Sequence, residues 1–412
     1  MRSRMQAALA MHLALATCSP GQGATTGMAG TSDTGETGKT SEATPTTGAA
    51  TITPPGNLPP VAKIVDDLGE DLAAPLRVQL SSEGSSDPDG SIVAAHWDLG
   101  DGALGDSEAL SHTYAADGTY ALRLTVVDDD GASGEATRTI TVGGCPRFQA
   151  GKSVGKLAAA ALTEASGLAF SRQAPGVVWS HNDSEAQPRL YTFNDLGAPL
   201  GAYALQGVDV RDWEDMALGP GPKPGQEYLY VGDIGDNNAE YASVAVHRVS
   251  EPPVDRGKSG VVASLGGVES FAFTFPGGPR NCETMLVDPV AGDLYLVSKS
   301  VDGTSLVFRA AAPLASGPLT EVARLEFGPG GLTTGGSVSA AGDWVVVRTY
   351  FAVRMWHRAA GTALHEAFTG AGCEVPVAME MQGEAIGFAA QGLDYYTTSE
   401  GAQPPLYRFT RG

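Results

Sequence analysis

Short apolar stretches that alternate with polar residues recur along most of this chain, separated by turns rich in glycine and aspartate. Examples are LRVQLSS at residues 76–82 and RLTVVDDDG at residues 123–131. Alternation with a period of two over four to eight residues is typical of β-strands that bury one face. The chain has 54 glycines among 412 residues and few long stretches with helical periodicity. The pattern therefore predicts an all-β protein with more than one domain.

The first 56 residues differ from this pattern and predict export. Arg2 and Arg4 precede an apolar stretch at residues 5–16 that has the length of a signal peptide. The sequence Leu-Ala-Thr-Cys that ends at Cys18 resembles a bacterial lipobox, which implies a lipoprotein signal peptide at 1–18 and lipidation of Cys18. An ordinary secretory signal with a chance cysteine is the alternative. Residues 19–56 are rich in Ser, Thr, Gly and Pro, which predicts a disordered linker.

Short strands at the spacing of a small β-sandwich occupy residues 57–143. Trp97-Asp98-Leu99-Gly100-Asp101-Gly102 is followed by His112-Thr113-Tyr114 and by Gly118-Thr119-Tyr120. On these motifs the segment resembles PKD domains, which are immunoglobulin-like sandwiches, with Leu99 in place of the usual Phe. We expect a core that contains Trp97, Tyr114, Tyr120, Leu122, Leu124 and Val126.

The PKD resemblance also implies a calcium site, because some PKD-like domains bind Ca²⁺ near their strand ends. The positions that match are Asn57, Asp87, Asp89 and the run Asp128–Asp130, in which Asp129 is the central residue. Clustered carboxylate oxygens are the ligands that Ca²⁺ prefers. The alternative is that these aspartates only cap turns.

Residues 145–412 contain five repeated units, which begin at Ser166, Glu214, Glu283, Gly335 and Glu384. Each unit is a short strand, a Gly/Pro turn and a second strand such as YLYV or WVVV, often followed by a third. Successive units lie about 50 residues apart except between the second and third, and this repetition predicts a β-propeller. We favour six blades, with five as the alternative, because VASLGGVESFAFTF and FQAGKSVGKL can supply a sixth blade or the ring-closing strands. A jelly roll or a β-helix is the second choice of fold.

Two motifs connect this domain to a known group. Asp212-Trp213-Glu214-Asp215 and the sequence YLYVGDIGDN at 228–237 resemble uncharacterised bacterial TolB-like six-bladed propellers, which are loosely similar to gluconolactonase-type and phytase-like propellers. Gluconolactonase-like propellers hold a catalytic Ca²⁺ in the channel. That resemblance implies a fold and does not by itself assign a function.

The repeats place polar residues at equivalent positions, where we expect them to converge on one mouth of the central channel. The expected ligands of a divalent ion, Ca²⁺ by preference, are Glu214, Asp233, Glu283 and Glu384, with Asn182 or Asp183. Lys299 and Arg348 can offset the negative charge, and the expected ligand-binding residues are Asn182, Asp183, Lys299, Arg348 and Tyr350. Catalytic candidates are Glu283, Glu384 and His181. The alternative is that these acidic residues close turns or link blades.

Charge and cysteine content complete the sequence-based picture. The formal net charge of −21 argues against nucleic-acid binding. Among Cys145, Cys282 and Cys373 one disulfide can form, and the sequence does not decide which. We expect a monomeric, lipid-anchored binding or adhesion protein of the outer membrane or cell surface, touching the membrane only through its anchor. Its PKD module presents a propeller to an unknown surface ligand, protein or carbohydrate. An extracellular Ca²⁺-dependent hydrolase of lactones, esters or phosphates is the alternative.

Overall fold

The computed structural model describes residues 56–184 and 187–412. The predicted signal peptide, Cys18 and all but the last residue of the predicted linker lie outside the described residues. In the described part of the chain, no helix is both long and apolar enough to cross a membrane.

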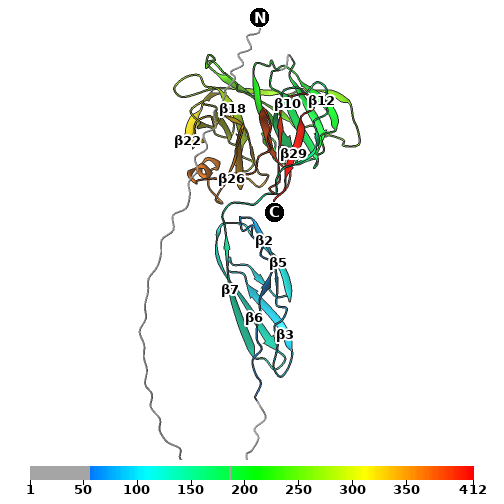
Figure 1. The fold of residues 1–412 in the computed structure, drawn as a ribbon, viewed down its shortest axis with the longest axis vertical. Coiled ribbons are helices and arrows are strands. Elements are labelled where there is room, and N and C mark those ends of the chain that lie inside the picture. The colour runs from blue at the N-terminus through cyan, green and yellow to red at the C-terminus, as the bar shows by residue number, and fades with distance from the viewer. Residues whose placement is uncertain (1–55, 185–186) are drawn as a thin grey trace, which may run out of the picture. The chain divides into compact units, whose positions relative to one another are not determined.

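The N-terminal domain is a β-sandwich, as the alternating strands predict (Figure 1). Every second residue of β2 is buried, and the two sheets enclose Trp97, Leu122, Leu124 and Val126. Tyr114 is also buried and donates a hydrogen bond from its hydroxyl to the carbonyl of Leu99. One sheet has the strand order β1 (Val65–Asp66), β2 (Leu76–Ser81), β5 (Ala109–Tyr114), and the other β4 (Leu104–Gly105), β3 (Ile92–Asp98), β6 (Gly118–Asp128), β7 (Ser133–Val142).

The C-terminal domain is a β-propeller, in which the described residues form five sheets. From the innermost strand outward, the blades are β9 (Ala165–Phe170), β10 (Val177–Asn182), β11 (Arg189–Asn194), β12 (Pro199–Leu205), β16 (Val261–Leu265); β13 (Trp213–Pro220), β14 (Glu227–Asp233), β15 (Val244–Ser250), β17 (Glu269–Thr274), β21 (Gly317–Pro318); β18 (Cys282–Val287), β19 (Leu294–Ser298), β20 (Thr304–Ala310), β22 (Thr320–Glu326); β23 (Thr333–Val338), β24 (Trp344–Thr349), β25 (Val353–His357), β26 (Cys373–Val375); and β27 (Gly383–Phe388), β28 (Tyr395–Ser399), β29 (Pro405–Phe409), β8 (Lys152–Lys156).

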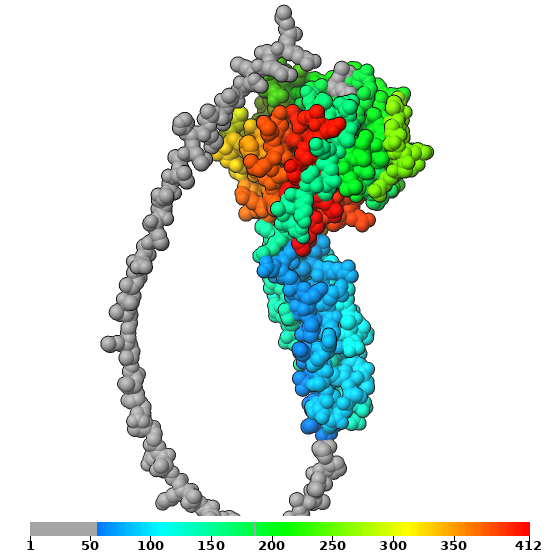
Figure 2. All heavy atoms as spheres, turned by 45° about the vertical axis from the view of Figure 1, so that its right-hand side comes forward, coloured from blue at the N-terminus to red at the C-terminus, as the bar shows by residue number. Residues whose placement is uncertain are grey.

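The ring closes through the two ends of the domain. The innermost strands β9, β13, β18, β23 and β27 pack side by side in that order, and β27 packs against β9. The N-terminal strand β8 pairs with the C-terminal strand β29 and so completes the fifth blade. In Figure 2 the red C-terminal residues accordingly lie between orange residues and green ones. Pairing of the two ends of the domain within one blade holds the ring closed.

The five repeated units of the sequence coincide with the five blades, so the ring has five blades rather than the favoured six. The two stretches considered for a sixth blade extend existing sheets instead. Strand β16 pairs in parallel with β12, and β17 pairs with β15. The segment FQAGKSVGKL contains β8 and closes the ring.

The structure also settles the cysteine pairing. Cys145 and Cys373 form the disulfide, which links the start of the propeller domain to β26. Cys282 is buried as a free thiol at the start of β18.

A short 3₁₀ helix, η1 (Leu364–Thr369), lies between β25 and β26. Its Leu364 and Phe368 pack into the core between the third and fourth blades.

Candidate functional site

A β-bulge at the start of each of three innermost strands directs a glutamate to the same end of the channel. Pairing of β13 with β14 jumps from Trp213 to Asp215, and equivalent jumps skip Glu283 in β18 and Glu384 in β27. A bulged residue leaves the ladder, so its side chain can point in a direction that regular pairing would not allow. We call this end of the channel the acidic mouth. Glu214, Glu283 and Glu384 are therefore structural equivalents, as the repeats predict.

Three carboxylates meet at one side of the acidic mouth. Asp183, Asp212 and Glu214 each offer an oxygen, and these oxygens all lie within 4.8 Å of one another. We call these three residues the acidic cluster. No described residue donates a hydrogen bond to the Glu214 carboxylate, and Oδ1 of Asp183 is buried without a hydrogen-bond partner. Burial, followed by repulsion from Asp212, raises the pKa of Asp183 to about 8. Burial and repulsion from Glu283 raise the pKa of Glu214 well above its ordinary value.

The chain holds the acidic cluster in place mainly through backbone contacts. The amide of Trp213 donates to the carbonyl of Asp183 at 3.0 Å, and the amide of Gly235 donates to the carbonyl of Asp212 at 3.2 Å. A Cβ on residue 235 would lie 2.2 Å from Glu214 Oε1 and 2.4 Å from Asp212 Oδ2, so any larger residue would displace these carboxylates. Gly235 thus leaves free the space that the cluster surrounds.

Asp233 does not join the acidic cluster, although the sequence predicted it as a metal ligand. Its Oδ1 accepts the amide of Asp212 at 3.0 Å and lies 3.5 Å from Nε of Arg211. Its Oδ2 lies 4.0 Å from Nε2 of His247. Asp233 therefore positions Asp212, and the guanidinium group of Arg211 compensates its charge.

Lys299 compensates the other side of the mouth. Its Nζ donates to Oε2 of Glu283 at 2.5 Å and to the hydroxyl of Tyr350 at 3.0 Å. Nδ2 of Asn281 donates to Oε1 of the same glutamate at 3.0 Å. Burial raises the pKa of Glu384 to about 7, with Lys299 opposing the rise and Glu283 adding to it. Both oxygens of Glu283 thus have partners, whereas the acidic cluster has no ion pair with any described residue.

Three residues predicted for the site are buried in structural roles instead. His181 is fully buried with its ring edge-on to Trp213, and burial lowers its pKa to about 4. Arg348 is fully buried and pairs with Glu380 at 3.0 Å. Oδ1 of Asn182 accepts the amides of residues 163 and 164, so this side chain shapes a loop. None of the three therefore lines the acidic mouth.

Asp212 is the main residue that the sequence analysis missed. It precedes the first innermost-strand residue of its blade, and the repeats compare only strand starts and strand ends. The sequence does contain a signal for Asp212, because it lies two residues before Glu214. In an extended chain, side chains two residues apart point to the same side. Two carboxylates that flank a buried tryptophan at this spacing predict a pair facing one space.

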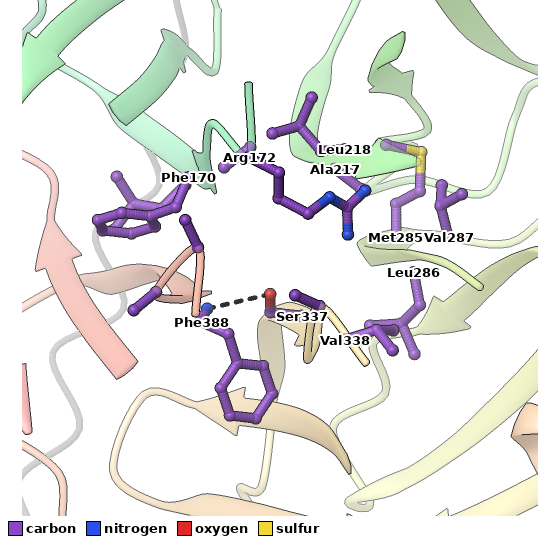
Figure 3. A pocket seen from close by; sticks show the side chains of 15 residues that line it. Phe170, Arg172, Ala217, Leu218, Met285, Leu286, Val287, Ser337, Val338 and Phe388 are labelled. Carbon is purple, nitrogen blue, oxygen red and sulfur yellow. Dashed lines mark hydrogen bonds between the residues drawn. The ribbon is translucent and has the colours of Figure 1, made fainter. Parts of the chain in front are cut away.

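The opposite end of the channel is narrow, and the guanidinium group of Arg172 lies among the side chains that line it (Figure 3). It is a cavity of about 30 Å³ lined by residues from all five innermost strands, with Phe170 and Phe388 among them. The only hydrogen bond drawn there runs from the amide of Phe388 to Ser337 Oγ at 3.2 Å. Such a volume admits no more than a few water molecules.

Large apolar side chains stand exposed on the loops of the acidic-mouth face. Phe351 follows β24 and is 73% exposed, while Met379 and Met381 precede β27 and are 93% and 98% exposed. Tyr241 and Val301 are exposed on the loops that follow β14 and β19. We call these five residues the apolar rim. They lie on four of the loops that border this face.

A second acidic group lies at one end of the sandwich. Both oxygens of Asp87 are inaccessible and lack a hydrogen-bond partner, and burial and nearby carboxylates raise its pKa. A Cβ on Gly90 would lie 2.5 Å from Asp129 Oδ1 and 2.7 Å from Asp87 Oδ2. Asn57 Nδ2 donates to Asp128 Oδ2 at 3.1 Å, and Asp89 accepts the amide of residue 58. The residues that the PKD resemblance singled out are thus gathered at one place.

Comparison with known proteins confirms the sandwich. Residues 57–142 match the family model described as PKD domain. A microbial collagenase of Vibrio alginolyticus is 38% identical over 65 residues, which are 16% of this chain and 8% of the collagenase. The chain therefore spans less than a tenth of that relative's length.

Two solved structures are also similar. The PKD1 domain of the Vibrio cholerae metalloprotease PrtV is 36% identical and covers 21% of this chain and 100% of its own, with a TM-score of 0.19. A putative phosphatase of Bacteroides thetaiotaomicron is 10% identical and covers 85% of this chain and 97% of its own, with a TM-score of 0.35. These likenesses assign no activity to the propeller.

Proposed function

We propose that this chain is an exported, surface-anchored binding protein whose propeller binds its ligand at the acidic mouth together with a divalent cation. The observation that carries the proposal is the acidic cluster: one oxygen each of Asp183, Asp212 and Glu214 lies within 4.8 Å of the others, and none of the three residues forms an ion pair with a described residue. Like charges this close repel strongly where water is excluded. A bound cation removes that repulsion.

The donor atoms favour Ca²⁺. All three side chains offer hard carboxylate oxygens, which Ca²⁺ prefers. The gap left by Gly235 and the buried Oδ1 of Asp183 without a partner suit an ion in the space between the carboxylates. The orphaned carboxylate of Asp87 supports a second Ca²⁺ in the sandwich, bound by the residues that resemble those of PKD calcium sites.

The apolar rim supports binding of a macromolecular surface, protein or carbohydrate. Phe351, Met379 and Met381 expose apolar contact area on loops of the acidic-mouth face. Binding sites commonly combine apolar contact area with a few fixed polar groups. The sandwich and the predicted lipidated Cys18 and linker fit a role in presenting this face outside the cell.

Calcium titration of the full chain by calorimetry tests the proposal. We expect two sites per chain. Asp87→Asn should remove the sandwich site, and Asp212→Asn combined with Glu214→Gln should remove the propeller site. Glu321→Gln, which changes an exposed carboxylate on β22, is the matched control and should leave both sites. Two unchanged sites in the Asp212/Glu214 double variant would contradict the propeller site.

One observation favours a hydrolase as a second candidate. A carboxyl group with a pKa of about 7, as in Glu384, suits a general base near neutral pH. A bound Ca²⁺ would supply Lewis-acid polarisation of a carbonyl or phosphoryl oxygen. Turnover of a lactone, a nitrophenyl ester or a nitrophenyl phosphate that disappears in Glu384→Gln, while Ca²⁺ binding persists, would favour this function. No turnover with all three substrates would favour binding alone.

A further inference from the structure

A pocket of about 560 Å³ opens on the acidic-mouth face between the second and third blades. Its walls come from three loops, at residues 236–239, 279–281 and 298–302, and from β20 and β22. We call it the interblade pocket. Pockets of about 300 to 1,000 Å³ are the size that binds small molecules.

Arg280 in this pocket lacks a partner. The Nε atom of its guanidinium group is buried without a hydrogen-bond acceptor, and the group forms no ion pair with any described residue. Other arginines of the propeller are paired, for example Arg172 with Glu227 and Arg309 with Asp293. Because the chain carries a net charge of −21, a basic group left without an acidic partner is unusual.

The surroundings hold Arg280 in position without neutralising it. Its guanidinium lies over the ring of Phe308, 5.6 Å from the ring centre. Two acidic residues line the pocket, and both are already bound by their own loops. Asp236 accepts the amides of residues 240 and 241, and Asp302 accepts Ser300 Oγ and the amide of Thr304. The positive charge of Arg280 is therefore available to a ligand.

The other polar groups of the pocket suit hydroxyl groups. Asn237, Asn281, Ser300 and Thr304 line it, and hydroxyl and amide side chains both donate and accept hydrogen bonds. Lys299 also lines the pocket, but its ammonium group is held by Glu283 and Tyr350. Arg324 lines it too and pairs with Glu321 at 3.8 Å, so Arg280 is the cation of this pocket that forms no ion pair with a described residue.

We propose that the interblade pocket binds the oxyanion of a hydroxyl-rich small molecule, a sugar acid or a sugar phosphate, with Arg280 as the anion-binding residue. A guanidinium group binds carboxylate and phosphate through two parallel hydrogen bonds. The pocket requires no cation in the acidic cluster, so this site goes beyond the proposed function, and either one can fail without the other.

The test is calorimetric titration of the full chain in EGTA with D-glucuronate, glucose 6-phosphate and glucose. We expect the two anions to bind and glucose not to bind. Arg280→Gln should weaken binding about tenfold or more, since it removes a charge-assisted hydrogen-bonding group. Val301→Glu should also weaken binding, because it adds a negative charge at the pocket lip on a side chain that is 81% exposed. Val262→Glu is the matched control, at a residue that is 87% exposed and lies outside the pocket.

The wild-type protein alone can overturn the proposal. Absence of heat with both anions would exclude the site even if Arg280→Gln failed to fold. Equal binding to wild type and Val301→Glu would exclude the pocket as the place of binding. Whichever of glucuronate and glucose 6-phosphate binds more tightly identifies the oxyanion that the pocket prefers.

Discussion

Arg348 is the residue for which sequence and structure lead to opposite predictions. As a ligand-binding residue, it should affect binding and leave stability unchanged. In the structure its guanidinium group pairs with Glu380 and also donates to the carbonyls of Ala385 and Thr398, at 2.9 and 3.3 Å. These contacts link β24 of the fourth blade to the fifth blade. Arg348→Met should therefore destabilise the propeller.

The loss of stability in Arg348→Met depends on the buried groups that the substitution leaves without partners. The substitution leaves the buried carboxylate of Glu380 without its cation and removes the donor from two carbonyls. Breaking a buried ion pair on one side costs about 3–5 kcal/mol. Burial already raises the pKa of Glu380 above its ordinary value of 4.5, although Arg348 opposes the rise. Without Arg348 the pKa rises further, so the stability of the variant should fall as pH rises from 5 to 8.

Urea unfolding followed by tryptophan fluorescence measures this effect. Four of the five tryptophans, Trp179, Trp213, Trp344 and Trp356, lie in the propeller, so the signal reports mainly on that domain. The Arg348→Met/Glu380→Gln double variant should be less destabilised than the two single losses together, because it leaves no unpaired charge. If Arg348→Met unfolds within about 1 kcal/mol of wild type at pH 8, the argument for a structural role is wrong.

Three further predictions concern the mouth and the disulfide. Glu384 should make the propeller less stable in EGTA as pH rises from 4.5, its ordinary pKa, through about 7, its pKa in the folded protein. The loss should reach about 3 kcal/mol at most. Glu384→Gln should therefore reduce the dependence of the melting temperature on pH. An unchanged slope would contradict this. Cys145→Ser with Cys373→Ser should lower the free energy of unfolding by about 2–5 kcal/mol in denaturant titrations, because the disulfide closes a loop 228 residues long. Gly235→Ala should abolish Ca²⁺ binding to the propeller in calorimetry, since its Cβ would meet Glu214 and Asp212, whereas Gly370→Ala, with its nearest neighbour at 3.5 Å, should not.

The sequence predicted most of the architecture because strand periodicity and repeats are local patterns. The starts of the five units fall on the five innermost strands, and the equivalence of Glu214, Glu283 and Glu384 follows from the same alignment. Blade number depended on long-range pairing instead. Whether Val261–Leu265 begins a new sheet or pairs in parallel with β12 is decided by which edge is free in three dimensions. No local pattern contains that information.

Individual site residues were harder to predict, because the same residue type serves both charge compensation and ligand binding. Asp233 and Glu283 look alike in sequence, yet the first is compensated by Arg211 and the second by Lys299. The sequence pattern does not distinguish Arg348 from Arg280. Of these two arginines, Arg348 pairs with Glu380, whereas Arg280 forms no ion pair with a described residue. A charged residue of a candidate site differs from one in a structural ion pair because it has no countercharge nearby. The presence of a charge alone does not distinguish the two.

The two ends of the channel decide where a ligand can bind. Asp215 is fully buried next to Glu214, and its carboxylate accepts the amides of Met216, Met285 and Gly336, which belong to three innermost strands. These bonds tie the strands together between the acidic mouth and the cavity of about 30 Å³ at the far end. Asp215 thus separates the acidic cluster from the narrow far end of the channel. We therefore expect the proposed ligand of the acidic cluster to approach from the face that also carries the apolar rim and the interblade pocket.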